Sequence, residues 1–227
     1  MKSELGVLLL PILAACTLTT PTDTTMNQTK TKSPEIIKLP APVRQGRMSL
    51  EEAIARRRSV REFSPDLLTE QELSQLLWSA QGMTDPAGYR AAPSAGALYP
   101  LEIYAAMPSG FYHYEVREHQ LTRLTDRDLR SAIYRAALEQ EAVLQAPVDF
   151  VITAVYVRTE RKYGEERGPR YVHLEAGHAA QNMLLQAVAL GLGAVPIGAF
   201  HDGTLQKALA LPADHTPLYV IPVGHPR

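Results

Sequence analysis

A run of arginines is the first segment whose side chains could do chemistry. Arg57, Arg58 and Arg61 stand close together, with Ser59 among them, at the end of a predicted helix. Guanidinium groups bind phosphate through paired hydrogen bonds, so this segment could form the cationic wall of a phosphate pocket. Charge alone favours a simpler interpretation, in which the arginines only cap a solvated helix end.

Two later loops are candidates for ligand contact, and the small residues of the first would let a flat ligand approach the backbone closely. The residues concerned are Pro93, Ser94 and Ala97 in the first loop, and Pro196, Ile197, Gly198 and Ala199 in the second. In the second loop, the N–H groups after the proline could face a ligand instead of a neighbouring strand. Each loop could equally be a plain turn, because nothing in its sequence requires a ligand.

Lys162 and Tyr163 are adjacent in a segment that we predict to be a loop. A neighbouring amine and phenol can supply the acid and the base for proton transfer to and from a substrate. The two residues are therefore a candidate catalytic pair. The alternative is an exposed surface loop without a chemical role.

His173, Glu175 and His178 superficially suggest a zinc site on a predicted helix. Zinc peptidases place two histidines four residues apart on one helix face, with the glutamate directly after the first histidine. Here the histidines are five residues apart and the glutamate comes two after the first, so the side chains diverge. We predict no metal site.

The elements that must position these segments are both helices and strands. Ser49 and Thr69 each stand three residues before a glutamate, a capping-box pattern that begins a helix. Apolar patterns predict strands at 101–107, 111–116, 120–124, 148–157, 194–197 and 218–223, and further helices at 126–144, 171–190 and 204–211. Because the two kinds of element do not alternate regularly, we expect an α+β fold with a mostly antiparallel sheet.

The composition of the 227-residue chain excludes several classes of function. Its formal net charge of -1 provides no basic surface for nucleic acid. A single cysteine, Cys16, excludes an intrachain disulfide and sites with several cysteine ligands for zinc or iron–sulfur clusters. Redox chemistry in the folded part would therefore need a bound cofactor.

The N-terminal segment resembles an export signal followed by a tether. Residues 5–13 form an apolar run that is too short to span a membrane but has the length of a signal-peptide core. Residues 13–16 resemble the bacterial lipobox, in which cleavage precedes a cysteine that becomes lipidated. We expect a signal peptide at 1–15, a lipidated Cys16 with a flexible Thr/Pro-rich tether at 16–42, and a folded domain at 43–227. The alternative is an untargeted N-terminus with a chance cysteine.

The order and spacing of four motifs resemble the nitroreductase superfamily, and most closely its SagB/ThcOx-type dehydrogenases. The motifs are RRSVREF at 57–63, PSAGALYP at 93–100, LEAGHAAQN at 174–182 and GLGAVPIG at 191–198. The resemblance covers about residues 39–226. It implies a nitroreductase-like α+β fold, with helices flanking the sheet, and a homodimer that binds FMN at the subunit interface.

The resemblance also implies roles for individual residues. Arg57, Arg58, Ser59 and Arg61 would hold the FMN phosphate, the ribityl chain and the N1/O2 edge of the ring, where positive charge favours the reduced flavin. Pro93, Ser94 and Ala97 would reach the flavin from the other subunit. Pro196, Ile197, Gly198 and Ala199 would bring a backbone N–H, near Gly198, to flavin N5.

Two positions depart from the pattern of many relatives. Where Gly198 stands, many relatives have a glutamate, but a contact through the backbone N–H survives that change. Many relatives also reach the phosphate with a basic residue in a C-terminal extension. Arg227 is the candidate for this role, and otherwise the phosphate would depend on the first motif.

Lys162 and Tyr163 resemble the Lys-Tyr pair of members that dehydrogenate thiazolines and oxazolines in modified peptides. We therefore expect an FMN-dependent oxidoreductase that transfers hydride through flavin N5 and acts on a small-molecule or peptide substrate. The alternatives are an NAD(P)H-dependent nitro or quinone reductase and a non-enzymatic flavin-fold lipoprotein. A lipid anchor on the outer side of a bacterial membrane would separate the protein from cytoplasmic NAD(P)H, which favours the dehydrogenase.

Overall fold

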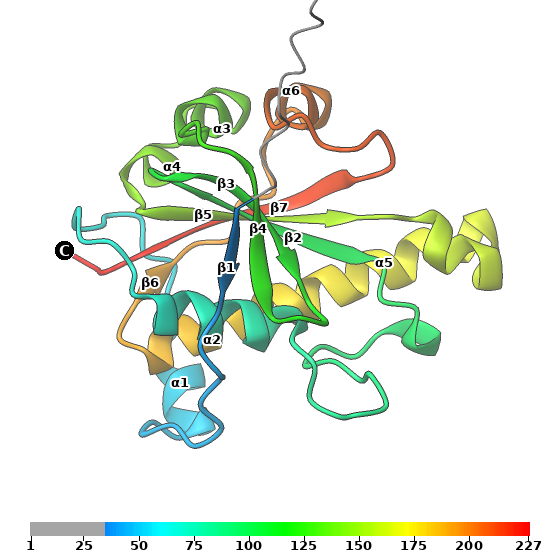
Figure 1. The fold of residues 1–227 in the computed structure, drawn as a ribbon, viewed down its shortest axis with the longest axis horizontal. Coiled ribbons are helices and arrows are strands. Elements are labelled where there is room, and N and C mark those ends of the chain that lie inside the picture. The colour runs from blue at the N-terminus through cyan, green and yellow to red at the C-terminus, as the bar shows by residue number, and fades with distance from the viewer. Residues whose placement is uncertain (1–34) are drawn as a thin grey trace, which may run out of the picture. The chain divides into compact units, whose positions relative to one another are not determined.

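A computed structural model of the protein describes residues 35–227, which form a seven-stranded sheet with helices on both faces (Figure 1). The strands follow the order β1-β4-β3-β2-β5-β7-β6, and every neighbouring pair is antiparallel. They are β1 (Ile36–Lys38), β2 (Leu101–Met107), β3 (Gly110–Glu115), β4 (Gln120–Thr125), β5 (Val148–Ala154), β6 (Gly193–Ala194) and β7 (Thr216–Gly224). This architecture confirms the expected α+β fold with its mostly antiparallel sheet.

The helices divide between the two faces of the sheet, as Figure 1 shows. One face carries α1 (Leu50–Arg56), α2 (Glu70–Gln81) and α5 (Val157–Ala189), and the other carries α3 (Arg130–Ala136), α4 (Glu141–Gln145) and α6 (Asp202–Ala208). Alternate side chains of β5 pack into the two apolar layers, because successive residues of a strand point to opposite faces. Phe150 and Ile152 belong to the layer under α2 and α5, and Val151 belongs to the other.

Both predicted helix starts are observed, and at Thr69 the capping box is complete. Ser49 Oγ accepts the Glu52 N–H at 3.1 Å at the start of α1. At the start of α2, Thr69 Oγ1 accepts the Glu72 N–H at 3.2 Å, and the Glu72 carboxylate accepts the Thr69 N–H at 2.7 Å. α1 ends at Arg56, directly before the arginine-rich segment.

The sheet begins earlier in the sequence than the expected domain start at residue 43. β1 pairs with β4, and Leu39 continues this contact by donating its N–H to the His119 carbonyl at 3.2 Å. The predicted signal peptide, Cys16 and most of the predicted tether lie outside the described residues. Among the residues that are described, none of the helices is long and apolar enough to cross a membrane.

Two helical predictions need correction. The helix predicted at 126–144 is two short helices, because Leu138 and Glu139 adopt left-handed backbone angles (φ 57° and 56°) that end α3. The helix predicted at 171–190 begins much earlier, at Val157, and continues across a break at Gly164 (φ 78°). Lys162 and Tyr163, predicted to lie in a loop, are therefore helical residues just before this break.

Candidate functional site

The arginine-rich segment 57–63 runs between β6 and the C-terminal residues. Ser59 forms a parallel bridge with Ala194, and the Val60 N–H donates to the Ala194 carbonyl at 3.0 Å. On the other side, the Arg227 N–H donates to the Glu62 carbonyl at 3.2 Å. The fold thus brings three predicted cofactor segments together: the arginine motif, the chain that follows β6, and Arg227.

The arginines of this segment differ in what they contact. Arg58 Nη1 donates to the carbonyls of Ala55 and Arg57, at 2.9 and 2.7 Å, so this side chain caps the end of α1. Within residues 35–227, the side chains of Arg57 and Arg61 form no hydrogen bond and no ion pair. Arg58 therefore caps the helix end through Nη1, while Arg57 and Arg61 keep all their guanidinium donors for a ligand. The predicted cofactor role of Arg58 stays a prediction.

The segment after β6 presents open backbone donors. Ile197 exchanges backbone hydrogen bonds with Val220 at 2.8 and 3.0 Å, and the pairing with β7 ends there. Gly198 and Ala199 are exposed, and neither N–H has a partner within the described part of the chain. A Cβ added at Gly198 would meet no atom within 4 Å. Open N–H groups near unpaired arginines fit the FMN contacts that the sequence resemblance implies.

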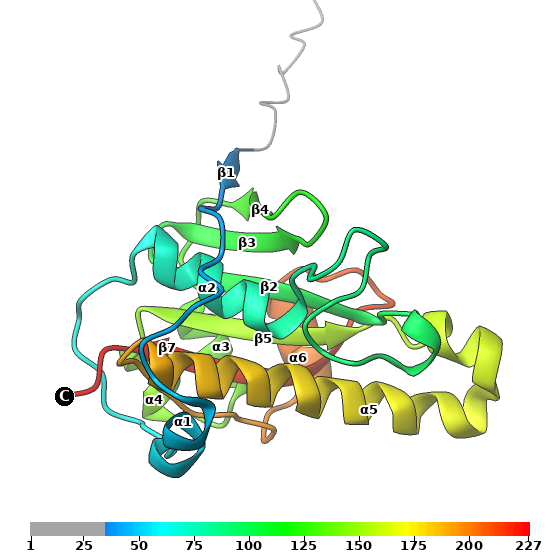
Figure 2. The same cartoon turned by 90° about the horizontal axis from the view of Figure 1, so that it is seen from below.

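The loop with Pro93, Ser94 and Ala97 lies elsewhere on the chain. It contains a short 3-10 helix (Ala95–Ala97), and the Tyr99 N–H closes it by donating to Ser94 Oγ at 2.9 Å. Figure 2 shows this loop beside the N-terminal half of α5, whereas α1, β6 and the C-terminus lie toward the other end of that helix. A single chain therefore keeps the two halves of the predicted cofactor site apart.

Lys162 and Tyr163 lie against this loop. A Cβ built on Gly96 would lie 2.8 Å from Lys162 Nζ and 3.0 Å from the Tyr163 hydroxyl. The Tyr163 ring packs edge-on against Tyr171, with 4.7 Å between the ring centroids, which fixes its direction. The predicted catalytic pair and the predicted cofactor loop thus meet within one chain, although the pair is helical.

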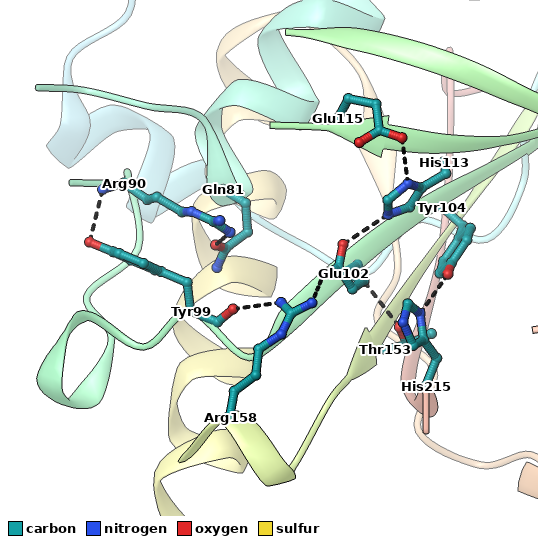
Figure 3. Close-up of polar contacts among 10 residues, drawn as sticks. All are labelled: Gln81, Arg90, Tyr99, Glu102, Tyr104, His113, Glu115, Thr153, Arg158 and His215. Atoms are coloured by element: carbon teal, nitrogen blue, oxygen red, sulfur yellow. Dashed lines mark hydrogen bonds and ion pairs between the residues drawn. The ribbon is translucent and has the colours of Figure 1, made fainter. Parts of the chain in front are cut away.

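A polar network that the sequence analysis missed lies behind the loop (Figure 3). Glu102 accepts hydrogen bonds from Arg158 at 2.5 Å and from His113 at 2.8 Å, and His113 also bonds Glu115 at 3.0 Å. Burial acts to raise the pKa of Glu102, but the hydrogen bonds from His113 and Arg158 outweigh it and hold the pKa at about 2. Despite its own burial, His113 has a raised pKa because two carboxylates accept its N–H groups. Glu102 is therefore ionised at neutral pH.

Glu175, considered above for a zinc site, is instead buried beneath the loop. Gln81 Nε2 donates to Glu175 at 3.4 Å, while Gln81 Oε1 accepts from Arg90 Nη1 at 3.0 Å. Burial raises the pKa of Glu175 to about 7. His173 points away from it and bonds the Tyr156 hydroxyl at 2.6 Å. A glutamate among the apolar positions of a helix was the sequence signal for this buried group.

The chain has an α+β fold, with one antiparallel sheet between two helical layers, that is found in a solved relative. Its structure matches that of a candidate nitroreductase from Ralstonia eutropha JMP134 with a TM-score of 0.78 and 32% identity, over 85% of this chain and 90% of the other. A model of the nitroreductase family matches residues 54–225, and the chain belongs to this family. Members of the family are FMN-dependent oxidoreductases.

Individual relatives differ in how much of the chain they share. The candidate nitroreductase MJ1384 of Methanocaldococcus jannaschii is 43% identical over 183 residues, which are 78% of this chain and 91% of that protein. The trifolitoxin-processing protein TfxB of Rhizobium leguminosarum bv. trifolii is 32% identical over 116 residues, but these are only 45% of this chain and 30% of TfxB. A candidate nitroreductase from Desulfovibrio desulfuricans in complex with FMN shares the fold at 23% identity, with a TM-score of 0.61 over 79% of this chain and 87% of that one.

Proposed function

We propose that this chain is a SagB-type, FMN-dependent dehydrogenase in which Lys162 and Tyr163 handle the proton of the substrate. The observation that carries the proposal is the meeting of these two side chains with Gly96, in the loop expected to line the flavin. The likeness to TfxB, whose name describes the processing of trifolitoxin, supports a role in processing a larger product, and we propose a modified peptide as substrate.

The cofactor would be held by groups that lack other partners within the described residues. Arg57 and Arg61 would bind the phosphate and the N1/O2 edge of the ring, because forked guanidinium groups suit both. The N–H groups of Gly198 and Ala199 would donate toward N5. Arg227 lies beside the same segment and would add positive charge near the phosphate. When bound, FMN supplies a two-electron acceptor that the side chains lack.

The reaction that fits these groups is the oxidation of a ring such as a thiazoline. The substrate loses one proton and one hydride, so the C–C single bond of the ring becomes a double bond. Lys162 or Tyr163 would take the proton, and bound FMN would supply the acceptor for the hydride. A final acceptor such as dioxygen would take two electrons and two protons, which equal the hydride and the proton lost by the substrate, and would leave as hydrogen peroxide.

Two copies of the chain would complete each site. Within one chain the loop that contains the short 3-10 helix (Ala95–Ala97) lies beside the N-terminal half of α5, whereas α1 lies toward the other end of that helix (Figure 2). A second copy would then supply the loop. Leu50 and Ile54 on α1 are 61% and 56% exposed, which leaves apolar surface for such a contact beside the arginine segment. We therefore propose a homodimer with two sites at its interface.

An NAD(P)H-dependent nitro or quinone reductase is the second candidate. The likeness to MJ1384 over most of both chains favours it. The two functions differ in the electron donor, since the reductase takes hydride from NAD(P)H and the dehydrogenase takes it from its own substrate. A protein anchored through Cys16 outside the cytoplasm would favour the dehydrogenase, and mass spectrometry of protein extracted from membranes tests for the lipid.

The purified full-length chain can be tested first for bound FMN and then for oxidation of a thiazoline. Bound FMN gives a yellow protein with absorbance near about 450 nm, a property of the cofactor itself. Replacing both Arg57 and Arg61 with alanine should abolish this colour. Arg127 is an exposed arginine outside the segment, so Arg127→Ala should leave the colour unchanged. A peptide with one thiazoline should lose two mass units with matching oxygen uptake, and Tyr163→Phe with Lys162→Ala should stop this.

Different results would contradict different parts of the proposal. A colourless chain that cannot be reconstituted with FMN contradicts the cofactor assignment. An FMN-loaded chain that oxidises NADPH with menadione, but leaves the thiazoline peptide unchanged, shows the reductase instead.

A further inference from the structure

The loop from Ser94 to Tyr99 has a backbone conformation that its own residues disfavour. Ala97 and Tyr99 have φ angles of 54° and 46°, in the left-handed region that suits glycine. Residues other than glycine persist there only when their surroundings hold them. Hydrogen bonds from the Ala97 and Tyr99 N–H groups to Ser94 hold the loop from within, and contacts from outside can add to them.

Arg158 supplies such a contact at the end of the loop. Its Nη1 donates to the Tyr99 carbonyl at 3.0 Å, while its Nη2 donates to Glu102 at 2.5 Å (Figure 3). Arg158 lies in the first turn of α5, four residues before Lys162, and residues at this spacing share one helix face. One guanidinium group thus links the end of the loop to the helical turn that carries the catalytic pair.

The sheet fixes the direction of this guanidinium group. Glu102 lies on β2, and its second oxygen is held by His113 of β3 at 2.8 Å, which in turn bonds Glu115 at 3.0 Å. The Glu102 side chain is 15% exposed and the Arg158 side chain is 37% exposed, so solvent reaches the pair mainly from the arginine side. A lysine at position 158 would keep the charge but could not donate to both acceptors through one planar fork.

We propose that Arg158 is a positioning residue which, oriented by Glu102, holds the Ser94–Tyr99 loop against Lys162 and Tyr163. It sets the separation between the catalytic pair and the backbone of Gly96 without touching the substrate. The consequence for catalysis rests on the proposed function, but the hold on the loop does not.

The test compares Arg158→Lys and Arg158→Ala with matched changes at Arg167. Arg167 is an exposed arginine of the same helix, with no ion pair among residues 35–227. Hydrogen exchange followed by mass spectrometry should show faster exchange in peptides covering 94–99 for both Arg158 variants, and no change for Arg167→Lys or Arg167→Ala. In the FMN-loaded enzyme, kcat should fall about 100-fold with little change in KM, as expected for misplaced catalytic groups.

Chemical rescue separates positioning from a general loss of stability. Millimolar guanidinium should restore slow exchange and kcat to Arg158→Ala, because the ion can occupy the vacated site between Tyr99 and Glu102. Glu102→Gln keeps the shape of the acceptor and removes only its charge, so it should open the loop in the same way but to a smaller extent. This variant tests the proposal even if Arg158→Ala does not fold.

Loop exchange that stays at the wild-type rate in both Arg158→Lys and Glu102→Gln would overturn the proposal. Equal effects of the Arg158 and Arg167 changes would overturn it too. If the wild-type chain binds no FMN, the proposed function fails, yet the exchange measurements still decide whether Arg158 holds the loop.

Discussion

At the scale of single residues, Gly96 decides how closely the loop approaches Lys162 and Tyr163. A Cβ at this position would lie 2.8 Å from Lys162 Nζ, and the two side-chain ends would have to move away. We expect Gly96→Ala to lower kcat by about 100-fold, because a shift of about 1 Å in reacting groups has an effect of that order. Steady-state kinetics measures this change, and a fluorescence titration should show unchanged affinity for FMN.

Gly88→Ala is the matched control for this change. Gly88 also has a positive φ, 94°, but no atom lies within 4 Å of an added Cβ. The two substitutions thus share backbone strain and differ in the contact with Lys162 and Tyr163. An equal fall in kcat for both variants would mean that strain, and not this contact, governs the reaction.

Glu175 makes the stability of the chain depend on pH. Burial raises its pKa to about 7, against the lowering effects of hydrogen bonds from Ser94 and Gln81 and of the Arg90 charge. The unfolded carboxyl titrates near its ordinary value of 4.5, so the folded chain binds more protons between the two values. The contribution to stability is therefore fully present below pH 4.5 and is lost as pH rises through 7.

Replacing Glu175 with glutamine should remove this dependence. At 1.36 kcal/mol per unit of pKa shift, the wild-type chain should lose about 3 kcal/mol relative to Glu175→Gln between pH 4.5 and pH 8. Urea unfolding of both proteins across this range measures the difference. Glu118→Gln, at an exposed position, should run parallel to wild type. Parallel curves for Glu175→Gln and wild type would show that Glu175 is not the group responsible.

At the scale of secondary-structure elements, α1 presents an apolar surface that the rest of residues 35–227 does not cover. Ile54 is 56% exposed, beside the arginine segment that would hold the cofactor. We expect Ile54→Glu to convert a dimer into monomers and to lower the FMN content, because a charge would be buried in the interface. Sedimentation velocity and visible absorbance measure the two effects. Leu124→Glu, on the 53%-exposed Leu124 of β4, should change neither.

The elements differ in how well the sequence could predict them. Helix starts at Ser49 and Thr69 were predictable because a capping box is a local pattern of residues three apart. The helical state of Lys162 was not, since Gly164 and Pro169 locally favour a loop. The helix before the break forms because tertiary contacts, such as the bond from Arg158 to Tyr99, hold its first turn.

The same distinction applies to the candidate site. The motifs at 57–63 and 191–198 were predictable as segments, but their pairing through Ser59 and Ala194 depends on the whole sheet. The link between Glu102 and Arg158 joins residues 56 positions apart on a strand and a helix. No local sequence pattern predicts such a contact, so only the structure shows it.

At the scale of the whole molecule, the two halves of the proposed site lie toward opposite ends of α5 (Figure 2). One half comprises Arg57, Arg61 and the open N–H groups after β6, and the other comprises the Gly96 loop with Lys162 and Tyr163. A two-fold dimer, the commonest symmetric assembly, would place each half of one copy against the complementary half of the other. Each site would then contain residues from both chains.

Subunit complementation tests this arrangement directly. One inactive chain would carry Arg57→Ala and Arg61→Ala, and the other Lys162→Ala and Tyr163→Phe. In a mixed dimer one site carries both defects and the other site carries none. Random mixing of equal amounts makes about half of the dimers mixed, so about a quarter of wild-type activity should return. Refolded mixtures assayed against each variant alone measure this. If all the residues of a site came from one chain, every site in the mixture would carry one defect, and activity would stay at the level of the variants.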